Sequence, residues 1–105
     1  MTNPHEPPHP TDEVVQLTLY VAGESDLSRT AIRNFDELRS RLDPSKITTT
    51  QIDILANPEV AWKQRIVATP ILIRETEPVR KIVGDLSNGG RIVEALNLIE
   101  YLRAQ

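Results

Sequence analysis

The chain has 105 residues, no cysteine, and a formal net charge of −3 from 12 basic and 15 acidic residues. This length suits one small domain, the negative charge argues against a nucleic-acid partner, and the missing cysteine excludes disulfides and thiolate metal sites. No apolar run approaches the roughly 20 residues that span a bilayer, so we expect a cytoplasmic protein with no membrane partner.

Residues 1–13 are predicted to form an extended, mobile tail, because four prolines alternate there with polar residues. The tail has neither the basic nor the apolar region of a secretory signal. His5 and His9, the two histidines of the chain, lie in it. A solvated tail explains them better than weak metal binding, and we expect no metal and no cofactor. The remaining residues, 14–105, form the predicted domain.

The first strand is predicted over residues 15–21, because apolar and polar side chains alternate along it. The turn that follows, residues 22–26, offers several candidate helix caps, and a cap is the better explanation of Asp26. Apolar residues then recur every three or four positions, which predicts an amphipathic helix from about residue 28 to 42. Asp43-Pro44 ends this helix, because proline disfavours a helical residue before it.

A second strand is predicted over residues 47–55, which are rich in β-branched side chains. Asn57-Pro58 marks the start of a helix, because asparagine can cap a helix and proline needs no N–H in its first turn. This helix is predicted to end near Val67. It carries Trp62, and a helical tryptophan is more often a core residue than an interface residue. The basic residues beside it make an exposed aromatic–basic patch the alternative.

The C-terminal third is predicted to contain a hairpin and a helix. Residues 71–74 and 80–83 form two short antiparallel strands around a turn, and a loop with several candidate caps spans residues 84–90. The last element is predicted as one continuous helix over residues 91–103. Five apolar residues define its stripe: Ile92, Ala95, Leu96, Ile99 and Leu102.

The resulting order, β-α-β-α-β-β-α, is that of a thioredoxin-like α/β fold with a mixed sheet. Thr69-Pro70 precedes the third strand, where thioredoxin-like proteins carry a proline that is usually cis. The dithiol that normally lies beside this proline cannot exist in a chain without cysteine. A thioredoxin-like scaffold without its thiol indicates recognition rather than redox chemistry.

The residues that could support catalysis have simpler explanations. Ser25 and Ser28 lie where a redox thiol would be, but no histidine lies outside the tail to activate them. Asp53 and Asp85 are candidates for paired acid–base chemistry, although a solvated or capping role is the better interpretation of each. Gly89-Gly90 lacks the spacing and the lysine of a phosphate-binding loop. We therefore expect no enzymatic activity.

Four blocks of sequence closely resemble the KaiB family of circadian clock proteins. They are Leu19–Gly23, Ile52–Pro58, Ile66–Pro70 and Val79–Asn88. They follow the family's order with near-family spacing, and the likeness extends over about residues 15–103. Five residues within these blocks are taken as structural: Gly23, Asn57, Pro58, Thr69 and Pro70.

The resemblance implies a non-enzymatic partner of KaiC, a ring-forming hexameric ATPase and autokinase, whose phosphorylation or assembly cycle it would modulate in circadian or stress-related timing. It adds KaiA or a clock-output kinase as further candidate partners. It also implies two folds. One is a thioredoxin-like monomer that binds KaiC, and the other is a ground state, commonly tetrameric, whose last segment becomes a strand.

Two substitutions bear on the balance between these folds. Clock-type relatives carry a glycine and an aspartate where this chain has Ala95 and Asn97, which together with Gly84 and Asp85 form the expected fold-switch region. Alanine favours helix over glycine by up to about 1 kcal/mol, so we expect the thioredoxin-like state to be favoured, with the tetrameric ground state as the alternative. Arg65 aligns with a lysine that the family uses against KaiC. The predicted partner-binding residues are Trp62, Lys63, Gln64 and Arg65.

Two alternatives from other functional classes stay open. One is a cysteine-free enzyme of the thioredoxin superfamily, such as a glutathione transferase. The absence of a helical substrate domain and of a core histidine weighs against it. The other is a sensor module that resembles the N-terminal domain of a clock-output kinase.

Overall fold

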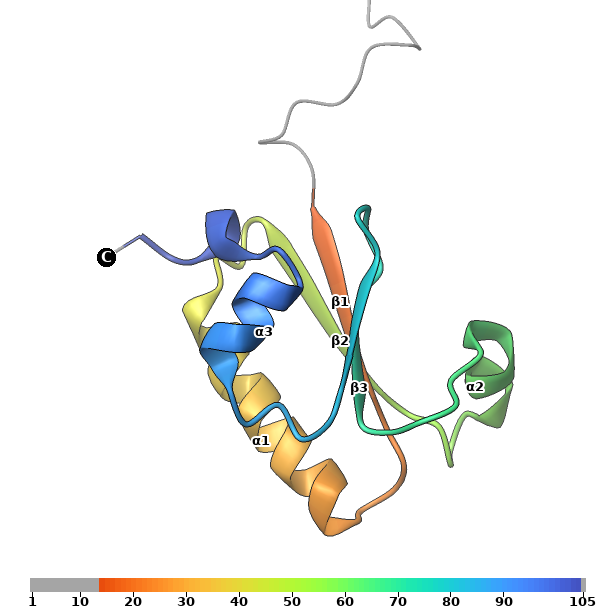
Figure 1. The fold of residues 1–105 in the computed structure, drawn as a ribbon. Coiled ribbons are helices and arrows are strands. Elements are labelled where there is room, and N and C mark those ends of the chain that lie inside the picture. Colours follow the sequence, from red (N-terminus) through yellow and green to blue (C-terminus); the bar gives the residue numbers. More distant parts are fainter. Residues whose placement is uncertain (1–13, 105) are drawn as a thin grey trace, which may run out of the picture.

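The computed structural model describes residues 14–104, so the predicted tail and its two histidines lie outside the described residues. The elements within this range are β1 (Val15–Val21), α1 (Asp26–Arg41), β2 (Ile47–Asp53), α2 (Pro58–Gln64), β3 (Ile71–Arg74), β4 (Arg80–Val83), α3 (Gly89–Ala95) and the 3-10 helix η2 (Ile99–Tyr101). The strands form one sheet in the order β2-β1-β3-β4. Helices α1 and α3 lie on one side of this sheet and α2 on the other (Figure 1).

The pairing of the strands confirms the predicted thioredoxin-like topology. β1 runs parallel to β2, with Val15 opposite Ile47. β3 runs antiparallel to both β1 and β4, and Ile71 lies opposite Val83 across the hairpin. Within residues 14–104, no helix combines the length and the apolar character that crossing a membrane requires.

The core has two parts, one on each side of the sheet. The larger part lies between the sheet and α1 and α3, and includes Val15, Leu17 and Leu19, which are completely buried. The smaller part lies on the α2 side and is built on Tyr20, Ile71 and Ile73. On the side of β1 predicted to be polar, Thr18 and Tyr20 are therefore also buried, while Gln16 is exposed.

The cap of α1 is Ser25, which lies within the predicted capping turn, and the interpretation of Asp26 as a cap is wrong. Ser25 has extended backbone angles, and its side-chain oxygen accepts a hydrogen bond from the N–H of Ser28 at 3.2 Å. Asp26 is instead the first helical residue and pairs with Arg29 at 3.0 Å on the surface. A serine oxygen satisfies one of the free N–H groups that every helix start leaves open, so the helix begins earlier than predicted.

The second helix also departs from its predicted bounds. Asn57 precedes the helix as predicted but makes no capping hydrogen bond through its side chain, whose NH2 group donates to the carbonyl of Asp53 at 3.0 Å. The helix ends at Gln64 rather than near Val67, because Arg65 adopts the left-handed conformation with φ of 54°. Its N–H then closes the last turn. Strand β2 is likewise shorter than predicted and ends at Asp53.

The prediction of one continuous C-terminal helix is wrong. Helix α3 begins after Asn88, whose side chain accepts a hydrogen bond from the N–H of Arg91 at 3.1 Å, and it ends at Ala95. Asn97 is left-handed with φ of 57°, and the chain then forms the separate turn η2. The break changes which side chains are buried. Leu98 is 0% exposed, whereas Ile99 of the predicted stripe is 63% exposed.

Candidate protein-binding site

Helix α2 is attached to the rest of the protein along one side only. None of its residues is fully buried. Val60 within it and Ile66 just after it pack against the cluster of Tyr20, Ile71 and Ile73. These two contacts leave the opposite side of the helix facing solvent, where α2 projects away from the sheet (Figure 1).

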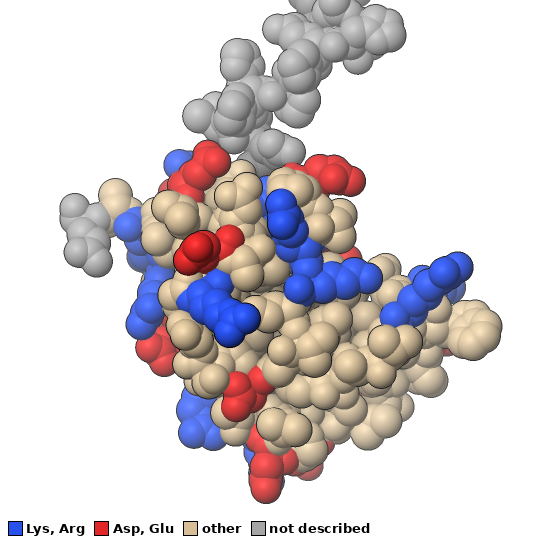
Figure 2. Space-filling view, in the orientation of Figure 1, with Lys and Arg blue, Asp and Glu red and all other residues tan. Residues whose placement is uncertain are grey.

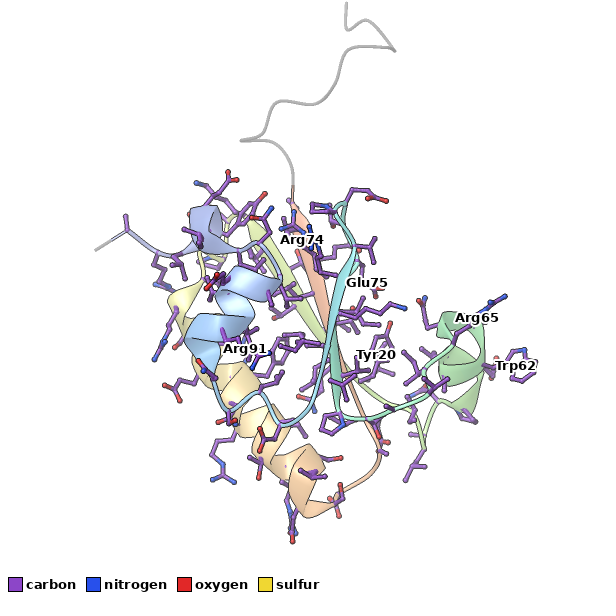
Figure 3. The ribbon with its side chains drawn as sticks, viewed as in Figure 1. Tyr20, Trp62, Arg65, Arg74, Glu75 and Arg91 are labelled. Atoms are coloured by element: carbon purple, nitrogen blue, oxygen red, sulfur yellow. The ribbon has the colours of Figure 1, made fainter. Side chains whose placement is uncertain are left out.

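Trp62 lies on the solvent side of α2, so its interpretation as a core residue is wrong. It follows Val60 by two residues, which places it about 200° further round the helix. Its side chain is 86% exposed, and Figure 3 shows it pointing away from the body of the protein. Val67, just beyond the helix, is 95% exposed. An exposed tryptophan with an exposed aliphatic neighbour is typical of a binding surface.

Trp62 borders an open hollow on the surface with a volume of about 850 Å³. The residues that line it are Pro58, Ala61, Trp62, Lys63, Arg65, Ile66 and Val67. The structure therefore brings three of the four predicted partner-binding residues together, while Gln64 is exposed but does not line the hollow. We call Trp62, Lys63, Arg65 and Val67 the α2 patch.

The two cations of the α2 patch are available to a partner. Both are exposed, and the ion pairs found in residues 14–104 all lie within α1. Arg65 ends the helix in its left-handed conformation, and its side chain extends outward in Figure 3. The basic side chains over α2 lie largely apart from the acidic side chains on that face (Figure 2). The α2 patch thus offers apolar and positively charged groups together.

The structural residues of the family blocks hold the loops at the ends of the strands. Thr69-Pro70 is cis, and the carbonyl of Pro70 accepts a hydrogen bond from the N–H of Gly84 at 2.9 Å. Gly23 has φ of 66°, and a Cβ there would lie 2.8 Å from Leu55 Cδ1. A side chain at this turn would therefore be strained, which favours glycine.

The residues considered for catalysis are engaged in local hydrogen bonds. The Ser25 hydroxyl donates to Ser28 Oγ at 3.0 Å, and the Ser28 hydroxyl lies 3.3 Å from the carbonyl of Ala22. Asp53 and Asp85 accept from backbone N–H groups of different loops. Within residues 14–104, no group of three or more acidic or histidine side chains is arranged to hold a metal. The hydrogen bonds of the two serines and the two aspartates fit capping roles.

The sequence did not predict one partly buried cluster of polar side chains. The hydroxyls of Tyr20 and Thr18 donate to Glu75 Oε2 at 3.0 and 2.9 Å. Burial, followed by the interaction with Glu75, raises the pKa of Tyr20 to about 12. Tyr20 therefore stays protonated at neutral pH and serves as a hydrogen-bond donor. Glu75 follows β3 and is more than 50 positions away in sequence, so no local pattern links it to Tyr20.

Asp53→Asn is expected to lower stability at pH 7 and to flatten its acid dependence. Hydrogen bonds from the N–H groups of Gly23 and then Leu55 hold the pKa of Asp53 below its ordinary value. A lowered pKa stabilises the folded state above the ordinary pKa, and this contribution is lost as the pH falls through the folded value. Urea titrations from about pH 7 to pH 2 test this. The exposed neighbour Glu24→Gln serves as control, and identical pH profiles for Asp53→Asn and wild type would contradict it.

The fold and the missing cysteine define a thioredoxin-like protein that lacks the redox dithiol. Chloroplastic thioredoxin z has a similar fold, with a TM-score of 0.68 and 17% identity over 84% of this chain and 80% of that one. Thioredoxin of Fasciola hepatica gives 0.66 and 16%, over 83% and 82%. At these identities, the likeness concerns the fold alone.

The proteins that match this chain in sequence differ from those that match it in fold. A family model described as the KaiB domain matches residues 18–98. The circadian clock oscillator protein KaiB of Acaryochloris marina is 38% identical over 84 residues, which cover 79% of this chain and 81% of the relative. The protein of the same name from a Cyanothece species is 34% identical over 99 residues, covering 91% and 94%. The chain belongs to the KaiB family.

Proposed function

We propose that this protein is a non-enzymatic clock-type regulator that binds a KaiC-type ATPase ring through the α2 patch. The observation that carries the proposal is the 86% exposure of Trp62 beside two cations that form no ion pair within residues 14–104, in a member of the KaiB family. The relatives are named as clock oscillator proteins, which supports the same class of regulatory role here.

The chemistry of the α2 patch suits a protein partner. Tryptophan and arginine are the residue types that contribute most often to binding hot spots, because they combine a large apolar area with directional polar groups. The hollow beside Trp62 is large enough to accept side chains of a partner. The local hydrogen bonds of Ser25 and Ser28 support a role in binding rather than in catalysis.

The experiment is co-elution of the full chain with the KaiC-type ATPase of the same organism, run with ATP and without nucleotide. We expect a stable complex in at least one nucleotide state and a change in the phosphorylation level of the ATPase. Absence of co-elution in both states at micromolar concentrations would contradict the proposal.

A further inference from the structure

Arg74, the last residue of β3, is a buried charge without an ion pair. It is 3% exposed, and none of the ion pairs in residues 14–104 includes it. Its charge is stabilised by hydrogen bonds to backbone carbonyls. The guanidinium donates to Thr76 at 3.0 Å, Glu77 at 3.1 Å, Leu96 at 3.1 Å and Asn97 at 2.7 Å. A buried charge needs hydrogen-bond partners, and these four carbonyls supply them.

These bonds join two segments that are distant in sequence. Thr76 and Glu77 belong to the turn between β3 and β4, and Leu96 and Asn97 follow α3. The planar guanidinium presents several donors in fixed directions, which a lysine cannot reproduce. It also lies 5.6 Å from the centre of the Tyr101 ring. Figure 3 shows Arg74 at the end of the sheet beside the C-terminal segment.

Arg74 also binds the free carbonyls just after α3, where the N–H groups of Asn97 and Leu98 close the helix locally. In a continuous helix, the carbonyls of Leu96 and Asn97 would accept hydrogen bonds from the N–H groups of residues 100 and 101. Arg74 takes both carbonyls instead, and the N–H of Tyr101 donates to Leu98 at 2.9 Å. The negative end of the helix dipole at these carbonyls favours a cation there.

The C-terminal segment is also attached by Leu96 and Leu98, which are buried in the core, and by hydrogen bonds at the end of α1. The carbonyl of Tyr101 accepts from the N–H of Asp43 at 2.8 Å, and Arg103 donates to the carbonyls of Arg41 and Leu42. The pairing of β1 with β2 and β3 uses none of these groups. We propose that Arg74 is a conformational clamp that binds the carbonyls just after α3 and holds residues 96–103 against the sheet, so that its loss releases this segment while the sheet and α1 stay folded.

The test is amide hydrogen exchange on the full chain carrying Arg74→Met or Arg74→Lys. Arg74→Met removes two charged hydrogen bonds to the segment, so exchange within residues 97–103 should rise on the order of 100-fold. Amides of β1 and α1 should keep wild-type exchange. Arg74→Lys should give a smaller rise in the same residues. The control is Arg80→Met, an exposed arginine directly opposite Arg74 in β4, which should leave exchange unchanged.

Unchanged exchange at residues 97–103 in Arg74→Met would overturn the clamp, and so would an equal rise in every element. If Arg74→Met does not fold, Arg74→Lys decides: a selective rise supports the clamp, and a uniform or absent rise overturns it. The measurement uses the chain alone, so its outcome does not depend on the proposed ATPase partner.

Discussion

Arg65→Glu is expected to weaken binding to the KaiC-type ATPase on the order of 100-fold or more, because reversal of a charge at an interface costs several kcal/mol. The side chain is exposed and belongs to no ion pair within residues 14–104. Its replacement should therefore leave the fold intact. Isothermal titration calorimetry measures the affinity, and far-UV circular dichroism checks that the variant is folded.

The matched control is Arg33→Glu, which makes the same change of charge on α1, across the sheet from α2 (Figure 1). Arg33 is exposed and outside the ion pairs of that helix, so wild-type affinity is expected. Equal weakening by both variants would indicate a general effect of net charge rather than a site at α2. Unchanged affinity in Arg65→Glu would place the interface elsewhere. Failure of wild type to bind would reject the proposed function itself.

The location of the candidate site was predictable from sequence, but the exposure of its tryptophan was not. Residue types and the family resemblance pointed to Trp62, Lys63 and Arg65. Whether Trp62 faces solvent depends on which side of α2 meets the sheet. That side is set by contacts of Val60 and Ile66 with residues of β1 and β3, which lie in other parts of the sequence and leave no periodic pattern in a helix of seven residues.

The order of elements was predictable because strand alternation and helical spacing are local patterns. The ends of α2 and α3 differ from prediction for the same physical reason. Arg65 and Asn97 adopt the left-handed conformation, which is uncommon for residues other than glycine, although asparagine adopts it more readily than arginine. At Asn97 the N–H donates locally to Glu94, and the carbonyl accepts a hydrogen bond from Arg74, more than 20 positions away. Neither helix propensity nor the spacing of apolar residues can predict a contact between residues so far apart in the sequence.

Because of the break after α3, alanine substitutions at the adjacent residues Leu98 and Ile99 should have unequal effects on stability. In a continuous helix, Ile99 would lie within about 20° of Ile92 on the buried side, and Leu98 would lie about 120° away. The structure reverses this, with Leu98 0% exposed in the core and Ile99 63% exposed. Leu98→Ala should therefore lower the free energy of unfolding by about 2–5 kcal/mol, and Ile99→Ala by no more than about 0.5 kcal/mol.

Urea denaturation followed by far-UV circular dichroism measures both values on the same chain, and Ile99→Ala serves as the control for Leu98→Ala. The two substitutions remove comparable apolar volume from adjacent positions, so the difference between them reports burial alone. A larger loss at Ile99 than at Leu98 would show that the helix runs on through residues 91–103 in solution. Equal losses would place both side chains at the surface of the core, and the fully buried position of Leu98 would then be wrong.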